Sequence, residues 1–122
     1  MSQCSLGASA SEKAEAGRIS RAIDQLRDAP NPQKGELLDA LKAAQCETAE
    51  LCELQRTCVD GFGQHVFALA ETTRAKSLMA TPEGAAEAAR ILEFAQSELS
   101  QAAEKINHCA DTQGATKRKY KL

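Results

Sequence analysis

Five cysteines and two histidines are the residues of this 122-residue chain whose chemistry could define a function. The cysteines follow none of the familiar spacings, since the sequence has no C-x-x-C for redox exchange or a zinc knuckle and no C-x-x-C-H for covalent haem. Cys46, Cys52 and Cys58 stand six residues apart. Six residues of α-helix rise about 9 Å, which is beyond the reach of a disulfide, so these three cannot pair inside one unbroken helix.

The two histidines suggest a metal site at one end of the molecule. In the predicted helix layout His65 begins a new helix at roughly the level of Cys58, and His108 adjoins Cys109. A structural zinc would need all four of these ligands in a tight tetrahedron. Two ordinary, half-exposed histidines are the simpler interpretation, and we expect neither a metal nor a cofactor.

Motifs for catalysis are missing from the sequence. A di-iron bundle would use paired Glu-x-x-His motifs, and the nearest match is Glu104 with His108, which is single and at spacing four. There is no glycine-rich phosphate loop and no G-x-S-x-G elbow. A nucleophile pair of Cys58 and His65 would lack an evident orienting acid or oxyanion pocket. The sequence predicts no catalytic residues, and therefore a protein that is not an enzyme.

Helix start and stop signals divide the chain into four amphipathic segments. Ser9 begins an S-x-x-E capping box, and Pro30 and Pro32 end the first segment. The two glycines within residues 60–63 predict a second break, and Thr-Pro-Glu at 81–83 predicts the start of the fourth helix. The predicted helices cover residues 10–28, 32–59, 63–80 and 82–110.

These segments predict an all-α, antiparallel up-down-up-down four-helix bundle with two long helices (the second and fourth) and two shorter ones. We expect one domain over residues 10–110, a flexible lead-in over 1–9 and a basic, disordered tail over 111–122. Val66 and Phe67 are assigned to the inner side of the third helix. The fourth helix carries the most regular apolar seam, formed by Ala85, Ala88, Leu92, Ala95, Leu99, Ala102, Ile106 and Cys109.

Disulfide pairing depends on this layout. Cys58 and Cys109 lie on seams that run to the same end of the bundle, so direction favours their pairing. Helix length opposes it, because a third helix of about 18 residues followed by a fourth of about 29 would carry Cys109 roughly 18 Å beyond Cys58. Cys4 could instead reach Cys109 or Cys52. The disulfide candidates are therefore Cys4, Cys52, Cys58 and Cys109, while five buried free thiols remain an alternative. An odd number of cysteines leaves at least one unpaired or intermolecular.

Composition limits the remaining classes of function. The basic end at residues 117–122 leaves a net charge of −6 for residues 1–116, and an acidic body is a poor binder of nucleic acid. No run approaches the roughly 18–20 apolar residues that span a bilayer. No secretory leader is visible, yet the cysteine usage and the small residues at the start favour an exported or periplasmic location over a cytoplasmic one.

The large apolar residues Leu, Ile, Val and Phe number only 21, against 23 alanines, so the core should be thin and in need of a disulfide, a metal or a partner chain. We predict a small non-enzymatic helical-bundle protein with an interaction or structural role, and a protein partner or self-association. Its docking surface or dimer interface is expected at the overhanging end of the fourth seam, at Leu99, Ile106 and Cys109. The alternative is a thiol-based metal-binding or redox protein that uses Cys58, His65, His108 and Cys109.

Overall fold

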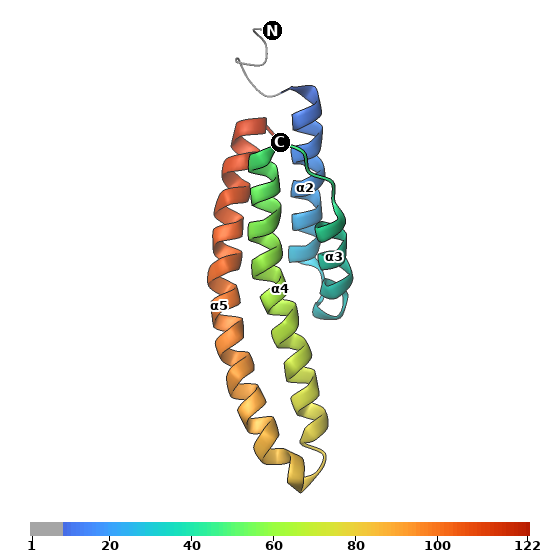
Figure 1. Cartoon of the computed structure of the whole chain (residues 1–122), viewed down its shortest axis with the longest axis vertical. Helices are drawn as coiled ribbons and strands as arrows, with labels where there is room; N and C mark the ends of the chain where they lie inside the picture. The colour runs from blue at the N-terminus through green and yellow to red at the C-terminus, as the bar shows by residue number, and fades with distance from the viewer. Residues whose placement is uncertain (1–8) are drawn as a thin grey trace.

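The computed structural model describes residues 9–122, and nearly all of them are helical (Figure 1). The four helices are α2 (Ala10–Asp28), α3 (Asn31–Ala43), α4 (Ala49–Leu78) and α5 (Pro82–Tyr120). No strand occurs between Ser9 and Leu122. The prediction of an all-α four-helix bundle is confirmed. The expected lead-in over residues 1–9 lies, apart from Ser9, outside the described residues.

Two of the predicted helix starts are built as the sequence indicates. The side chain of Ser9 accepts a hydrogen bond from the backbone N–H of Glu12 at 3.0 Å and so caps α2. Thr81 caps α5 in the same way by accepting from Gly84 N–H at 3.2 Å. A Cβ atom on Gly84 would lie 2.1 Å from the carbonyl oxygen of Leu78, so glycine is required where the chain turns from α4 into α5.

The boundary between the second and third helices differs from the prediction. The break falls at residues 44–48, and α4 continues through Gly61 and Gly63 without interruption. A Cβ atom on Gly61 would lie 3.1 Å from the backbone of Lys105 and Ile106, so this glycine lets α5 approach the backbone of α4. Its missing side chain serves helix packing rather than a turn.

This shift changes which helices are long. The bundle has two long and two shorter helices, as expected, but the long ones are the third and fourth in chain order, α4 with 30 residues and α5 with 39. The second helix, α3, has only 13 residues. The two long helices form one antiparallel hairpin, and the two shorter ones form a second hairpin beside it (Figure 1).

The basic segment at residues 111–122 is not the disordered tail that we expected. α5 continues to Tyr120, whose side chain is 3% exposed and whose hydroxyl donates to Glu50 Oε1 at 2.6 Å. Burial raises the pKa of Tyr120, and the Glu50 carboxylate raises it further, so the phenol stays protonated. Lys117, Arg118 and Lys119 occupy the last turn of α5, where positive charge stabilises the carbonyl end of a helix.

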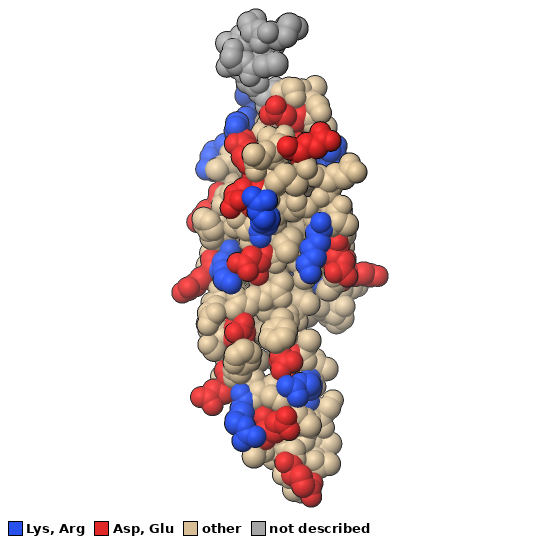
Figure 2. All heavy atoms as spheres, viewed as in Figure 1, with Lys and Arg blue, Asp and Glu red and all other residues tan. Residues whose placement is uncertain are grey.

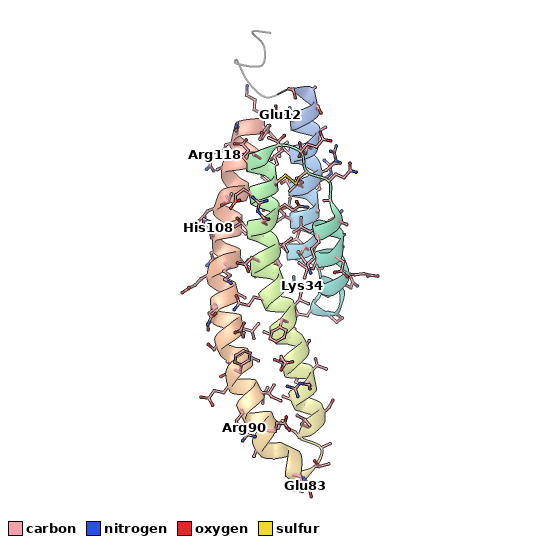
Figure 3. The ribbon with its side chains drawn as sticks, viewed as in Figure 1. Glu12, Lys34, Glu83, Arg90, His108 and Arg118 are labelled. Carbon is pink, nitrogen blue, oxygen red and sulfur yellow. A yellow bond between two sulfur atoms is a disulfide. The ribbon has the colours of Figure 1, made fainter. Side chains whose placement is uncertain are left out.

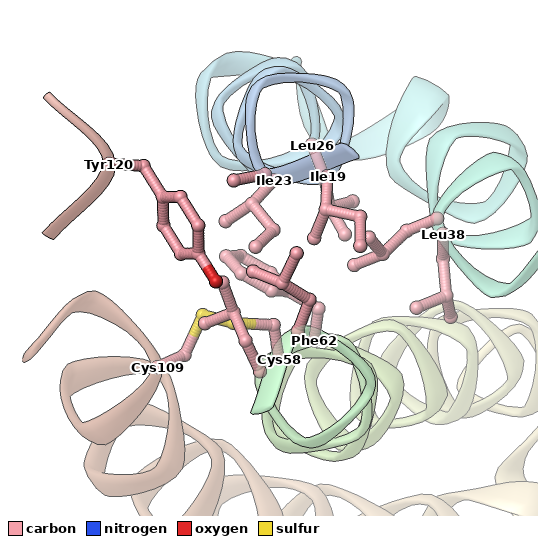
Figure 4. Packing of buried hydrophobic residues seen from close by; sticks show 12 residues of the cluster. Ile19, Ile23, Leu26, Leu38, Cys58, Phe62, Cys109 and Tyr120 are labelled. Carbon is pink, nitrogen blue, oxygen red and sulfur yellow. A yellow bond between two sulfur atoms is a disulfide. The ribbon is translucent and has the colours of Figure 1, made fainter. Parts of the chain in front are cut away.

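The α2–α3 hairpin covers only half of the longer hairpin. It lies beside the half of α4 and α5 where α4 begins and α5 ends, and the other half projects beyond it (Figure 1). The main core lies in the covered half and is surrounded by all four helices (Figure 4). Its larger buried side chains are Ile19, Ile23, Leu26, Leu38, Leu41, Leu51, Leu54, Phe62 and Tyr120. We call the projecting part, residues 66–99, the distal hairpin.

A buried carboxylate on α2 caps the start of α4. Glu15 is 6% exposed and accepts hydrogen bonds from the backbone N–H groups of Glu47 and Thr48 and, at 2.8 Å, from the hydroxyl of Thr48. Burial raises the pKa of Glu15, but these hydrogen bonds to the ionised form outweigh it, and the pKa lies below its ordinary value. The ionised carboxylate therefore stabilises the folded state.

Replacing Glu15 with Gln should lower the free energy of unfolding by about 1–3 kcal/mol at neutral pH, because buried N–H donors lose their charged acceptor. A carboxyl group whose pKa is lower in the folded than in the unfolded state stabilises the fold above its unfolded-state pKa, and this contribution disappears as pH falls through the folded-state pKa. The wild type should therefore lose more stability than Glu15→Gln on acidification below pH 4.5, the ordinary value.

Urea unfolding followed by circular dichroism at several pH values would measure both effects. Glu47→Gln is the matched control, since Glu47 is an exposed carboxylate beside the same cap. Equal unfolding midpoints and equal pH dependence for the two variants would contradict the role of Glu15.

Candidate functional site

Two disulfides join four of the five cysteines. Cys58 on α4 bonds to Cys109 on α5, with a Cα–Cα distance of 4.9 Å, and both residues are fully buried in the main core (Figure 4). Cys46 bonds to Cys52, with a Cα–Cα distance of 5.3 Å. Both of these residues are half-buried. Cys4, a predicted disulfide candidate, lies outside the described residues.

The expectation that Cys109 overshoots Cys58 by roughly 18 Å is wrong. It assumed that a short helix begins after Gly61, whereas α4 runs unbroken from Ala49 to Leu78 and packs against α5 along this length. The return of α5 therefore brings Cys109 to the level of Cys58, next to the close contact at Gly61.

The exclusion of a bond between Cys46 and Cys52 fails for a related reason. Cys46 was placed inside a helix, where six residues separate two side chains by too great a rise. In the structure it lies in the linker between α3 and α4, and only Cys52 is helical. The disulfide closes this linker onto the first turn of α4.

The four predicted metal ligands do not form a metal site. Cys58 and Cys109 are bonded to each other, and His108 is exposed on the outer edge of α5 (Figure 3). His65 is half-buried, and its pKa is lowered, first by burial and then by the positive charge of Lys34. Among residues 9–122 no group of three or more His, Cys, Asp or Glu side chains is placed to hold a metal ion.

The three predicted interface residues occupy different environments. Cys109 is buried, Ile106 is half-buried against the main core, and Leu99 is half-buried on the distal hairpin. The expected overhang beyond Cys109 is absent, because the start of α4 matches the end of α5 through the contact of Glu50 with Tyr120. The uncovered length of α5 is at the opposite end, toward Pro82 (Figure 1).

One side of the distal hairpin continues the surface that α2 and α3 cover in the other half. On α4, Leu69 lies two turns after Phe62, which belongs to the main core. On α5, Leu99 lies five turns before Lys117, which forms an ion pair with Asp24 of α2 at 3.3 Å. We call this surface the docking side; it consists of Val66, Leu69, Thr73 and Lys76 on α4 and Leu92 and Leu99 on α5.

A hollow opens on the docking side where α3 begins. Its volume is about 460 Å³, and it lies between the first turn of α3 and the middle of α4. Its walls are formed by Asn31, Pro32 and Gly35 and by Val66, Leu69, Ala70, Thr72, Thr73 and Lys76. The shorter hairpin thus ends beside a partly apolar surface that runs on without cover.

The other side of the distal hairpin carries two exposed aromatic residues that sequence reasoning missed. Phe67 is 49% exposed and Phe94 is 51% exposed, so the assignment of Phe67 to the inner side of its helix is wrong. The sequence does indicate that Phe94 is exposed, because it occupies one position in a stripe of polar residues that recur every three or four residues along the helix. This stripe contains Glu83, Glu87, Arg90, Phe94, Glu98, Gln101, Lys105 and His108.

Neither a protein-family model nor a curated protein nor a solved structure matches the chain. Within residues 9–122, no helix has both the length and the apolar character needed to cross a membrane. The function must therefore be inferred from the geometry of the helices, the disulfides and the two sides of the distal hairpin.

Removal of the Cys58–Cys109 disulfide should cost about 4 kcal/mol of unfolding free energy, and removal of Cys46–Cys52 about 2 kcal/mol, according to the entropy of loop closure. The difference arises because the bonds span 51 and 6 residues, respectively. Urea unfolding of Cys58→Ala/Cys109→Ala and of Cys46→Ala/Cys52→Ala would measure both costs. A larger loss for the second pair would contradict the role of Cys58–Cys109 as the main covalent link.

Proposed function

We propose that this protein is a non-enzymatic interaction module whose distal hairpin receives a helical segment of another protein on the docking side. The observation that carries this proposal is the unequal length of the two hairpins. α2 and α3 cover half of α4 and α5 (Figure 1). The docking side continues beyond them through the half-buried Leu69, Leu92 and Leu99.

A helix is the occupant that this surface fits best. The side chains of two antiparallel helices form ridges and grooves that accept further helices, as α2 and α3 already do along the covered half. The distal hairpin has a small core of Ala75, Ala88 and Ile91, with Leu78 and Leu92 packed against it. An added helix would bury the half-exposed leucines that this core leaves at the surface.

The disulfides indicate that the covered half acts as a rigid base for the distal hairpin. Cys58–Cys109 joins the two long helices within the covered half, between two and three turns from the distal hairpin, so the hairpin projects from a covalently closed base. Two disulfides in a chain of this size are typical of proteins in oxidising compartments. A partner of the same compartment is therefore expected.

A photo-reactive amino acid at Lys76 should cross-link to an amphipathic helix of a partner, because Lys76 borders the hollow on the docking side. The same group at Lys42, an exposed lysine on α3, is the matched control. Peptide mapping of the cross-linked product would identify the segment. Leu69→Glu should reduce the yield of the cross-linked product from Lys76 at least about tenfold, because the new charge would be buried against an apolar helix face.

Two outcomes would contradict the proposal. One is the recovery of the same products from Lys76 and Lys42. The other is an unchanged yield from Lys76 in a Leu69→Glu protein whose circular dichroism shows it to be folded. A cross-linked peptide without helical apolar periodicity would count against a helix as the occupant.

A further inference from the structure

We propose that two copies of this chain associate through the side of α4 and α5 that carries Phe67 and Phe94, with the long hairpins antiparallel to each other. This inference goes beyond the docking side and uses different residues. Successive residues of an α-helix turn by about 100°, so residues two apart point about 200° from each other. Phe67 therefore points away from Leu69, and Phe94 points away from Leu92.

The two aromatic side chains form one patch, because polar contacts between α4 and α5 lie on either side of them along the helices. Gln64 donates to Glu98 Oε2 at 2.7 Å; Phe67 lies one turn after Gln64, and Phe94 one turn before Glu98. At the other end Arg74 lies 3.8 Å from Glu87.

Arg74 follows Phe67 by seven residues, and Phe94 follows Glu87 by seven. The aromatic side chains are thus level with each other and central. We call this surface the aromatic face; it consists of Asp60, Gln64, Phe67 and Arg74 on α4 and Arg90, Phe94, Glu98 and Gln101 on α5.

The exposure of both rings needs an explanation. They are two of the three phenylalanines in a chain that has few large apolar residues, and both are about half exposed although the main core is thin. A pair of adjacent exposed rings surrounded by polar groups is typical of a site that another protein covers. On the face drawn in Figure 2, acidic and basic side chains are interspersed, without a field of one sign.

The charges around the rings select a second copy as the occupant. On α5, Arg90 and Glu98 stand four residues on either side of Phe94. A twofold axis at the level of the rings, perpendicular to the helices, would place Arg90 of each copy opposite Glu98 of the other. A parallel twofold arrangement would instead place α4 of each copy against α5 of the other, and Arg90 would not meet Glu98.

The same axis also matches charges on α4. Asp60 and Arg74 stand seven residues on either side of Phe67. The antiparallel arrangement places α4 against α4 and α5 against α5, so Asp60 of each copy would face Arg74 of the other. Opposite charges thus meet on both helices under one operation, which is the self-complementarity that a twofold interface requires.

The size of the aromatic face predicts a weak dimer. From Asp60 to Arg74 it is about 22 Å long, and two adjacent helices are roughly 20 Å wide. The pair of copies would bury on the order of 900 Å² in total, below the range of stable complexes. We therefore expect a dissociation constant in the micromolar range.

Sedimentation velocity over about 1–500 µM would test this. Every protein carries Cys4→Ser, so that this thiol cannot link two copies. The mass should rise with concentration from 13.0 kDa toward twice that value. Phe67→Ala/Phe94→Ala should weaken association by at least about tenfold, whereas Met79→Ala, which removes another exposed apolar side chain, should leave it unchanged.

Charge reversal distinguishes the proposed geometry from unspecific association. Arg90→Glu and Glu98→Arg should each weaken the dimer about five- to tenfold, because each places like charges opposite each other. The combined variant Arg90→Glu/Glu98→Arg should restore it. Circular dichroism and the unfolding midpoint of each variant would establish that it is folded.

A monomer at all concentrations would overturn the proposal, and so would failure of the folded combined variant to recover association. Leu69→Glu should not affect the dimer. A monomeric protein that still gives the specific cross-link from Lys76 would therefore contradict self-association alone, and a dimer without that cross-link would contradict only the docking of a helix.

Discussion

The close contact of α4 and α5 at Gly61 determines how the rest of the chain is arranged. Because glycine has no side chain, the backbones can approach to a distance that a Cβ atom would prevent, and the Cys58–Cys109 bond closes one turn away. The two helices are then aligned from the contact of Glu50 with Tyr120 at one end to the turn at Gly84 at the other. The α2–α3 hairpin packs onto this long hairpin, and its limited length decides which part stays uncovered.

The thin core is supplemented by polar side chains that satisfy helix ends on neighbouring helices. Glu15 of α2 caps the start of α4, and Gln55 of α4 donates to the carbonyl oxygens of Leu41 and Ala44 at the end of α3. Lys34 of α3 donates to the carbonyl oxygens at 26 and 27 near the end of α2. These bonds satisfy backbone groups that are buried or partly buried between helices, so they specify which helices lie together as well as stabilising them.

The fold class was predictable from the sequence because the capping residues, the prolines and the apolar spacing all act locally. The break between α3 and α4 was not, because it depends on contacts that are remote in sequence. Glycine in the middle of a helix costs about 1 kcal/mol relative to alanine. At Gly61 the packing of α5 against α4 outweighs this cost. Conversely, residues 44–48 contain no glycine or proline, and the structure holds this non-helical linker by contacts that are remote in sequence, such as those of Glu15 with the N–H groups of Glu47 and Thr48.

The candidate site was less predictable than the fold for the same reason. The role of Gln55 appears only when the end of α3 lies beside it. The basic segment at the end of the chain has the composition of a disordered tail, and only the burial of Tyr120 against α4 makes it helical. Direction favours the Cys58–Cys109 pairing, and the helix lengths that oppose it in the sequence depend on the misplaced break.

The unequal hairpins give the molecule two regions of different local stability. The covered half has the large apolar side chains, both disulfides and the polar caps, whereas the distal hairpin is held by a small core of alanines with Ile91. Few buried apolar contacts mean a lower free energy for local opening. A partner that binds the distal hairpin only when it is folded stabilises that hairpin by mass action. Its two sides would then be coupled, because occupation of one side orders the helices that form the other.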